Sequence, residues 1–171
     1  RRRRFDLRQV IDEVLSTLQP KLRKTTHRLD IDVAYGLLID SYPGPLEQVL
    51  TNFVENSLIH GLAHKADGLI TVSARVGADT VVVDYKDNGV GMDEAAAAKA
   101  FDPFYTTRLG QGGSGLGLYI VHNLVTGALG GSIHLVAAPG AGVCFTLVLP
   151  LIAPEVLVEK TLALASDDAA D

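Results

Sequence analysis

The chain has 171 residues, 47% of them hydrophobic and 20% charged, which is the balance of a single soluble globular domain. Its net charge of −5 argues against nucleic-acid binding by the domain as a whole. No stretch reaches the roughly 18 apolar residues that span a membrane, and the first residues lack the apolar core of a signal peptide. The single cysteine, Cys144, is expected to be a small core residue of a strand. Without an internal disulfide, we expect a cytoplasmic domain, whose parent protein is either soluble or membrane-bound.

The first 24 residues are predicted to form a basic segment followed by an amphipathic helix. The four arginines at positions 1–4 are interpreted as a solvated linker, with contact to a membrane or an acidic partner as the alternative. Over residues 5–24 the apolar positions recur at helical spacing. Asp6 is placed to cap the start of this helix.

The rest of the chain alternates between strands and helices. Strands are expected at 29–33, 37–39, 70–76, 80–85, 132–136 and 143–149, and helices at 46–59, 93–100 and 116–129, the last ended by glycines 130 and 131. The domain is expected to end near Pro150; a helix could follow over 151–165, before a disordered acidic tail at 166–171. This order indicates an α+β two-layer sandwich, with a mixed sheet of about five strands covered on one face by about three helices.

The helix predicted at 46–59 carries an unusual polar face. Asn52 and Asn56 are four residues apart and share that face, and Glu55 lies beside it. Asparagine prefers caps and turns to helix interiors, so two stacked asparagines indicate a polar task. The alternative is a solvent-facing stripe.

A second polar cluster, Asp87-Asn88-Gly89-Val90-Gly91, directly follows a predicted strand. Its glycines allow the backbone to approach a planar ligand, and its aspartate can accept hydrogen bonds from an amine. The alternative is an ordinary turn between a strand and a helix.

A glycine-rich loop over residues 110–117 leads into the helix predicted at 116–129. Free backbone N–H groups at a helix N-terminus are suited to holding phosphates. The loop formally matches a dinucleotide fingerprint, but no strand ends just before it and no acidic residue follows before Glu155. A Walker A motif is absent from the sequence.

Taken together, these clusters resemble four motifs of sensor histidine kinases. The segment Asn52-Phe53-Val54-Glu55-Asn56 resembles the N box, and Asp87-x-Gly89-x-Gly91-Met92 the G1 box. Residues 101–107 (Phe-Asp-Pro-Phe-Tyr-Thr-Thr) resemble the F box, and residues 113–118 (Gly-Ser-Gly-Leu-Gly-Leu) the G2 box. The resemblance covers residues 5–150. It implies the ATP-binding catalytic domain of a histidine kinase, with the Bergerat fold shared with gyrase, heat-shock chaperone ATPases and mismatch-repair ATPases.

The resemblance implies ATP and Mg²⁺ as ligands. Asp87 would receive the adenine amino group, with Gly89 and Gly91 letting the purine lie close. Asn56 would hold Mg²⁺, with Asn52 in support. Residues 101–115 would form a mobile lid, anchored by Phe101 and Phe104 and closing over the triphosphate. Its expected contacts, with those at the helix start, are Phe104, Arg108, Gly113, Ser114, Gly115, Leu116 and Gly117. Ile59 stands where many family members have a phosphate-binding lysine, so His60 or Arg108 would supply that contact.

Asn52 also distinguishes between subclasses of this fold. The related ATPases have a glutamate there that activates water, and an asparagine cannot act as a general base. Hydrolysis is therefore expected to be slow, whereas an imidazole is already nucleophilic near pH 7. Glu55 is either an assisting catalytic carboxylate or merely a polar helix residue.

The resemblance also implies partners. None of the five histidines is followed by Asp or Glu, as the family's phosphoacceptor is, so the acceptor is expected before residue 1. We therefore expect a connector at 1–24, the ATP-binding domain at 25–150 and a partly disordered extension at 151–171. The expected partners are the dimerisation and phosphoacceptor domain of the same kinase and the receiver domain of a response regulator. The alternatives are an ATPase or switch module and a non-catalytic nucleotide-sensing module.

Overall fold

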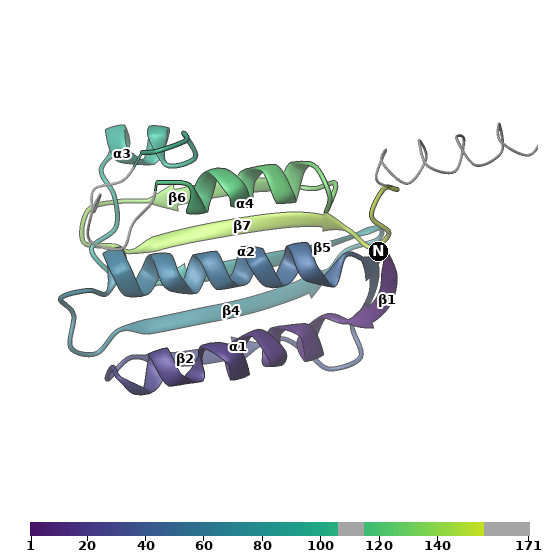
Figure 1. Cartoon of the computed structure of the whole chain (residues 1–171), viewed down its shortest axis with the longest axis horizontal. Coiled ribbons are helices and arrows are strands. Elements are labelled where there is room, and N and C mark those ends of the chain that lie inside the picture. Colours follow the sequence, from purple (N-terminus) through teal and green to yellow (C-terminus); the bar gives the residue numbers. More distant parts are fainter. Residues whose placement is uncertain (106–114, 156–171) are drawn as a thin grey trace, which may run out of the picture.

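The computed structural model describes residues 1–105 and 115–155, which build a five-stranded sheet with helices along one face (Figure 1). The strand order is β2-β4-β5-β7-β6. Strand β2 (Arg28–Asp32) runs parallel to β4 (Leu69–Val76), and the neighbours beyond β4 pair antiparallel: β5 (Thr80–Asp87), β7 (Val143–Pro150) and β6 (Ser132–Ala137). The predicted mixed sheet of the α+β sandwich is confirmed.

Three helices lie side by side on one face of this sheet: α1 (Leu7–Arg23), α2 (Pro43–Asn56) and α4 (Gly117–Thr126). A short helix, α3 (Glu94–Lys99), lies beyond the end of β5. No helix among the described residues is long and apolar enough to cross a membrane.

Strict alternation along the strands directs one row of side chains toward the helices. In β7 the buried residues are Val143, Phe145, Leu147 and Leu149, and the residues between them are partly exposed on the other face. Cys144 belongs to this partly exposed row, so its prediction as a core residue is wrong. The reason is the two-residue period of a strand, which turns Cys144 away from the helix layer.

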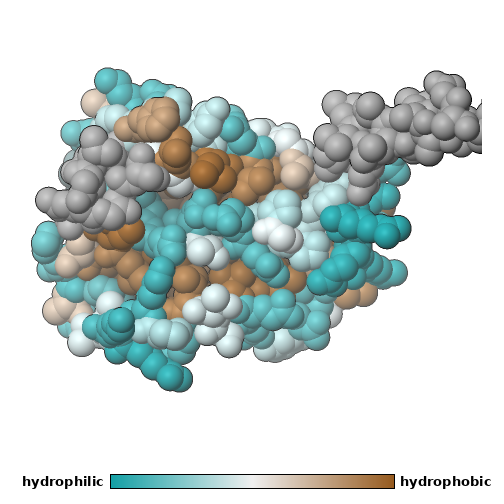
Figure 2. Space-filling view, in the orientation of Figure 1, coloured by the Kyte–Doolittle hydropathy of each residue, from teal (hydrophilic) through white to brown (hydrophobic). Residues whose placement is uncertain are grey.

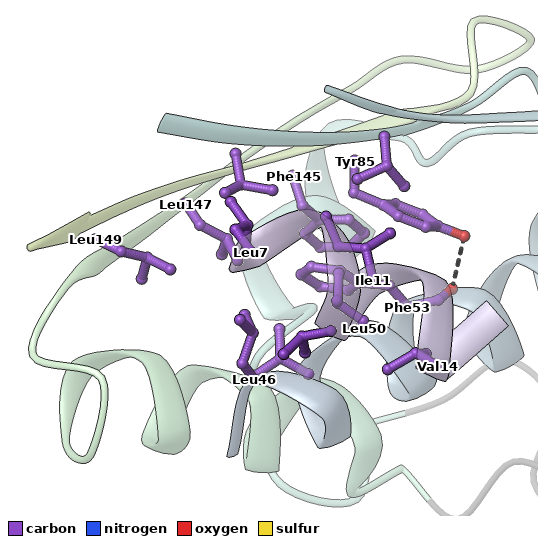
Figure 3. Packing of buried hydrophobic residues seen from close by; sticks show 14 of the residues in the cluster. Leu7, Ile11, Val14, Leu46, Leu50, Phe53, Tyr85, Phe145, Leu147 and Leu149 are labelled. Carbon is purple, nitrogen blue, oxygen red and sulfur yellow. Dashed lines mark hydrogen bonds between the residues drawn. The ribbon is translucent and has the colours of Figure 1, made fainter. Parts of the chain in front are cut away.

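The core centres on three aromatic rings between α2 and the sheet (Figure 3). The Phe53 ring stacks on Phe145 with centroids 4.5 Å apart and lies 5.0 Å from Tyr85. All three side chains are almost completely buried. They fix α2 against β5 and β7, the two strands whose ends form the candidate site.

Helix α1 contributes to the same core. Leu7, Ile11 and Val14 are buried, and Figure 3 shows them among the core side chains. Asp6 caps the helix as predicted, because its side chain accepts a hydrogen bond from the Arg8 backbone N–H at 2.9 Å.

The basic N-terminus is not a solvated linker. Residues Arg3–Asp6 form β1, which pairs antiparallel with β3 (Leu38–Ser41) in a separate two-stranded sheet. Arg2 donates a hydrogen bond to the Ala153 carbonyl at 2.8 Å and lies 3.5 Å from the Asp40 carboxylate. Strand pairing satisfies the backbone and buries Phe5, which a run of exposed arginines does not reveal.

The chain keeps contact with this small sheet beyond β7. Leu151 accepts a hydrogen bond from the Asp40 N–H, and Ala153 donates one to the Asp40 carbonyl. The hydroxyl of Tyr42 donates to the Pro154 carbonyl at 3.0 Å. Residues beyond the expected boundary near Pro150 therefore still pack on the small sheet. Residues 151–155 are not helical, and the remainder of the predicted helix and tail lies outside the described residues.

Two helix ends also differ from expectation. Helix α2 begins at Pro43, the favoured first position for proline, and continues after Asn56 as a π-helical turn, η1 (Ser57–Gly61). Helix α4 ends at Thr126 rather than near residue 129, because Gly127 forms its C-cap.

Replacing Ile11 by alanine should destabilise the chain by about 2–5 kcal/mol, the cost of a cavity in a packed core. Ile11 is only 1% exposed, so the cavity that alanine leaves would be closed to solvent. Urea unfolding followed by circular dichroism measures this change. The control is Gln9→Ala on the exposed face of the same helix, expected to stay within about 0.5 kcal/mol of wild type. A loss below about 1 kcal/mol for Ile11→Ala would contradict an integral α1.

Candidate functional site

The candidate site centres on Asp87 at the end of β5. Its side chain is buried, and the residue is only 6% exposed. Oδ2 accepts a hydrogen bond from Ser57 Oγ at 2.7 Å, and Oδ1 accepts from the backbone N–H groups of Gly89 at 3.0 Å and Val143 at 3.3 Å. A carboxylate offers about four acceptor positions, so these three described donors leave one for a ligand.

Ser57 and Tyr85 form a second layer behind the carboxylate that the sequence analysis missed. Ser57 Oγ lies 2.7 Å from the Tyr85 hydroxyl, which also donates to the Phe53 carbonyl at 3.1 Å. Burial raises the pKa of Tyr85 strongly, and the nearby charge of Asp87 raises it further, so the phenol stays neutral. Tyr85 and Asp87 are two apart on a strand and so share a face, which was readable from the sequence. Ser57, their partner on another element, was not.

The π-helical turn η1 fastens the end of α2 to the turn after β5. The hydrogen bond that defines this turn spans five residues, from the Leu62 N–H to the Ser57 carbonyl at 2.7 Å. The contact with the turn after β5 is made by the Val90 N–H, which donates to the Gly61 carbonyl at 3.0 Å. The turn places Gly61 against Asp87, where a Cβ atom would lie 2.7 Å from Oδ2. Single π turns often occur at functional sites, and this one brings two distant segments together.

Gly89 and Gly91 approach the backbone of their own protein closely. A Cβ atom at Gly89 would overlap the Gly61 carbonyl, and one at Gly91 would overlap the Ala138 carbonyl. Gly91 also has a φ of 68°, in the region that favours glycine. Both positions therefore require glycine for packing inside the protein, a reason separate from the expected approach of a purine.

The two asparagines of α2 have different surroundings. Asn52 Oδ1 accepts from Gln48 Nε2 at 2.8 Å, and its Nδ2 donates to the Gly117 carbonyl at 3.2 Å, which links α2 to the first residue of α4. Asn56, one turn later, is half-buried, and among the described residues its side chain has no hydrogen-bond partner. His60 follows one turn after Asn56, on η1.

Glu55 points to another neighbour. Its carboxylate is 2.7 Å from Lys21 Nζ of α1, whereas Asn52 contacts α4 on the opposite side of α2 (Figure 1). The structure therefore does not bring Glu55 together with Asn52. This position favours the interpretation of Glu55 as a polar helix residue.

The expected lid is described only at its two ends. Arg108, Gly113 and Ser114 lie outside the described residues. A Cβ atom at Gly115 would lie 2.5 Å from the Phe104 carbonyl carbon, so the two ends approach each other.

Phe104 is not a core aromatic anchor. Its side chain is 70% exposed and its φ is 64°, a value uncommon for a residue other than glycine. Phe101 does pack as expected, with its ring 5.6 Å from His122 and 6.2 Å from Phe145. The two phenylalanines of this motif therefore face different surroundings, which the motif alone did not reveal.

An open cleft of about 500 Å³ lies elsewhere, between α1 and β2. Its lining includes Asp12, Leu15, Arg23, His27 and Ile31, and none of the expected site residues lines it. The candidate site is therefore defined by Asp87 and α2 rather than by this cleft.

Comparisons with known proteins agree with this geometry. A family model described as histidine kinase-, DNA gyrase B-, and HSP90-like ATPase matches residues 42–153. The sensor protein TorS of Escherichia coli K12 is 30% identical over 92% of this chain, which spans 17% of TorS. The catalytic domain of histidine kinase ThkA is 27% identical, with a TM-score of 0.78, over 89% of this chain and 97% of that chain.

A complex of ThkA with the response regulator TrrA also matches, at 26% identity and a TM-score of 0.72, over 87% of this chain and 41% of that chain. The chain spans 12% to 31% of the length of three curated relatives that it matches, TorS among them. The likeness to ThkA confirms the predicted sandwich as the fold of a histidine kinase catalytic domain.

Replacing Gly61 by alanine should destabilise the chain by about 1–3 kcal/mol, because the new methyl group forces the anchored Asp87 carboxylate to move. Gly44→Ala is the matched control. Gly44 lies in the first turn of α2 with no atom within 4 Å of a Cβ, so alanine there should be neutral or stabilising by up to about 1 kcal/mol. Urea unfolding compares the two. Equal effects would show that Asp87 is not held against Gly61.

Proposed function

Because this chain belongs to the histidine kinase-, DNA gyrase B- and HSP90-like ATPase family, we propose that it binds Mg-ATP and transfers the γ-phosphate to a histidine. The histidine would lie on a separate dimerisation segment of the same kinase, and a response regulator's receiver domain would then take the phosphoryl group in two-component signal transduction. The observation that carries this proposal is Asp87, a buried carboxylate beside α2 with one acceptor position that no described donor fills.

The adenine base is proposed to bind at Asp87. An exocyclic amine donates hydrogen bonds, so it complements an ionised carboxylate, whereas a base with a carbonyl at that position would meet another acceptor. Gly89 and Gly91 add no side chains of their own to the turn after β5, and the backbone of this turn is proposed to lie against the planar base. The donors from Ser57, Gly89 and Val143 hold the carboxylate in one orientation and support this assignment.

Mg²⁺ is proposed to bind at Asn56, with Asn52 in support. This ion takes oxygen ligands, keeps several waters and shares substrate phosphates, so one amide oxygen is a suitable protein ligand. The fit is supported by the half-buried Asn56 side chain, which has no described partner. Within residues 1–105 and 115–155, no group of three or more His, Cys, Asp or Glu offers an alternative metal site. When bound, the ion would neutralise phosphate charge.

The phosphates are proposed to lie at the start of α4. Backbone N–H groups in the first turn of a helix have no intrahelical acceptor, and the helix dipole favours an anion there. Gly115, Leu116 and Gly117 lead into this turn. The remaining phosphate contacts are proposed for His60 and Phe104, and for Arg108, Gly113 and Ser114, which lie outside the described residues.

Asn52 is proposed to make the site a kinase rather than a hydrolase. An amide cannot take a proton from water, and both ends of this one already contact Gln48 and Gly117. A histidine acceptor needs no such base, because a neutral imidazole nitrogen is nucleophilic near pH 7. Glu55 is bound to Lys21, which supports a structural role for that carboxylate.

The phosphoacceptor segment is proposed to dock beside the start of α4. Tyr119 and Ile120 are 38% and 39% exposed, and Phe104 and Tyr105 add further exposed aromatic surface. Figure 2 shows apolar residues along α4 on the helix face. Large exposed apolar patches often mark protein contacts.

The wider assembly is proposed to follow the sequence expectation. Residues 1–24 are proposed to connect to the acceptor segment, and α1 would pass a displacement of that connector to α2 through their shared core. The complex of ThkA with TrrA supports a receiver domain as the downstream partner. We propose a cytoplasmic location for the domain, where ATP is available.

Replacing Asp87 by asparagine should weaken ATP binding about 10- to 150-fold, the range that corresponds to roughly 1.5–3 kcal/mol for a hydrogen bond to a charged group. The neutral amide loses the charge and can turn its own N–H toward the adenine amine. Calorimetry of the chain with ATP and with ADP, with and without Mg²⁺, measures the change. Asp84→Asn, on the opposite face of β5, should leave the affinity unchanged. A well-folded wild type that binds neither nucleotide would contradict the proposal.

With saturating Mg-ATP, the chain alone should release phosphate no faster than its Asn56→Ala variant, because Asn52 cannot activate water. A coupled phosphate assay compares the two proteins. Steady turnover by the wild type that Asn56→Ala abolishes would favour the alternative, an ATPase or switch module of the same fold.

A further inference from the structure

Two buried hydroxyl groups, those of Tyr85 on β5 and Ser57 at the start of η1, form a line of hydrogen bonds that ends at the Asp87 carboxylate. Tyr85 and Ser57 are 1% and 0% exposed, so neither hydroxyl exchanges its hydrogen bonds with solvent. The line runs from the Tyr85 hydroxyl to Ser57 Oγ at 2.7 Å, and from Ser57 Oγ to Asp87 Oδ2 at 2.7 Å. Both links are short and connect elements that are distant in sequence.

The direction of the line follows from counting protons. The Asp87 carboxylate only accepts, so the single Ser57 proton must fill the bond to Oδ2. The Tyr85 hydroxyl also has a single proton, so Ser57 Oγ at 2.7 Å and the Phe53 carbonyl at 3.1 Å share it. The raised pKa of Tyr85 keeps that proton on the phenol. The Ser57 proton therefore points toward the carboxylate, while the Tyr85 proton lies between Ser57 Oγ and the Phe53 carbonyl.

The Ser57 hydroxyl does not make the hydrogen bond that a helical serine usually makes, because it donates to Asp87 instead. A buried serine in a helix commonly donates to the carbonyl four residues earlier, which here is Phe53. That carbonyl already accepts from the Ser57 backbone N–H and from the Tyr85 hydroxyl, as Figure 3 draws for the latter. With this acceptor occupied, the Ser57 hydroxyl turns to Asp87. Tyr85 therefore directs the Ser57 hydroxyl toward Asp87 by sharing its own proton with the Phe53 carbonyl.

We propose that Ser57 and Tyr85 are positioning residues that set the preference of this site for a 6-aminopurine, an inference that rests on the proposed nucleotide site. Two backbone N–H groups hold Oδ1, and because rotation about the Cβ–Cγ bond moves both oxygens, the hydrogen bond from Ser57 to Oδ2 restrains the same rotation. Ser57 donates to Oδ2, the oxygen that keeps an acceptor position without a described donor, and so narrows the range over which that position can turn. The remaining acceptor position then has one direction, toward an amine on the base.

The inference is tested with two ligands that differ only in this amine. ATP carries the 6-amino group, and purine riboside triphosphate lacks it but keeps the ring, the ribose and the phosphates. Calorimetry in Mg²⁺ gives the affinity ratio of the two ligands for wild type, Ser57→Ala, Tyr85→Phe and the double variant. The matched control is Thr146→Val, which removes a hydroxyl that donates to Asp84 at 2.5 Å on the other face of the sheet.

Ser57→Ala should weaken ATP binding about tenfold and leave purine riboside triphosphate within about twofold of wild type. Tyr85→Phe should weaken ATP binding about threefold, and by nothing further in the Ser57→Ala background, because Tyr85 acts through Ser57. Thr146→Val should change neither affinity. Thermal unfolding of each variant checks folding, and Tyr85→Phe keeps the ring that packs on Phe53.

Three results would overturn the inference while leaving the proposed function intact. They are an unchanged ratio in folded variants, an equal loss for both ligands, and fully additive effects in the double variant. Failure of the wild type to bind ATP would instead reject the nucleotide site itself.

Discussion

The buried carboxylate of Asp87 is the constraint on which the arrangement of the site depends. Taking a charge out of water is costly unless donors replace its lost hydration. Here the donors come from three parts of the chain: Ser57 after α2, Gly89 in the turn after β5, and Val143 at the start of β7. Each must come within hydrogen-bond distance, so the ends of these elements converge on one group. The same charge that offers an acceptor to a ligand thereby organises the folded site.

The close approach of these segments explains features that look like ligand adaptations in the sequence. Gly89 and Gly91 belong to a motif typical of nucleotide binding, yet each lies where a side chain would overlap a carbonyl of the protein itself. Gly61, outside any motif, lies against Asp87 in the same way. The π-helical turn supplies the extra residue that lets Gly61 reach this position. At these positions the close approach of the protein's own backbone is therefore the first reason for glycine, and contact with a ligand is the second.

Periodicity predicted the main elements because each buries one face, and the cap at Asp6 followed from residue chemistry. Pairing between distant segments was less visible. Strand β1 has no alternating pattern of its own, since arginines precede Phe5 and Asp6 follows it, and the strand forms because β3 is available as a partner. The link between Ser57 and Tyr85 was hidden for a similar reason: a tyrosine facing inward resembles an ordinary core aromatic. Motif spacing indicated Asp87 and the two asparagines, but not the groups that hold them.

Helix α2 sets the distance between the two ends of the proposed nucleotide site. Asn52 bonds the first residue of α4, where phosphates are proposed to lie, and Ser57 bonds Asp87, where the base is proposed to lie. The two residues are five positions apart, so at about 1.5 Å per residue their backbones are separated by roughly 7–8 Å along the helix axis. The packed Phe53 side chain between them holds that segment against the sheet. The distance between the proposed base and phosphate positions is therefore set by a packed helix.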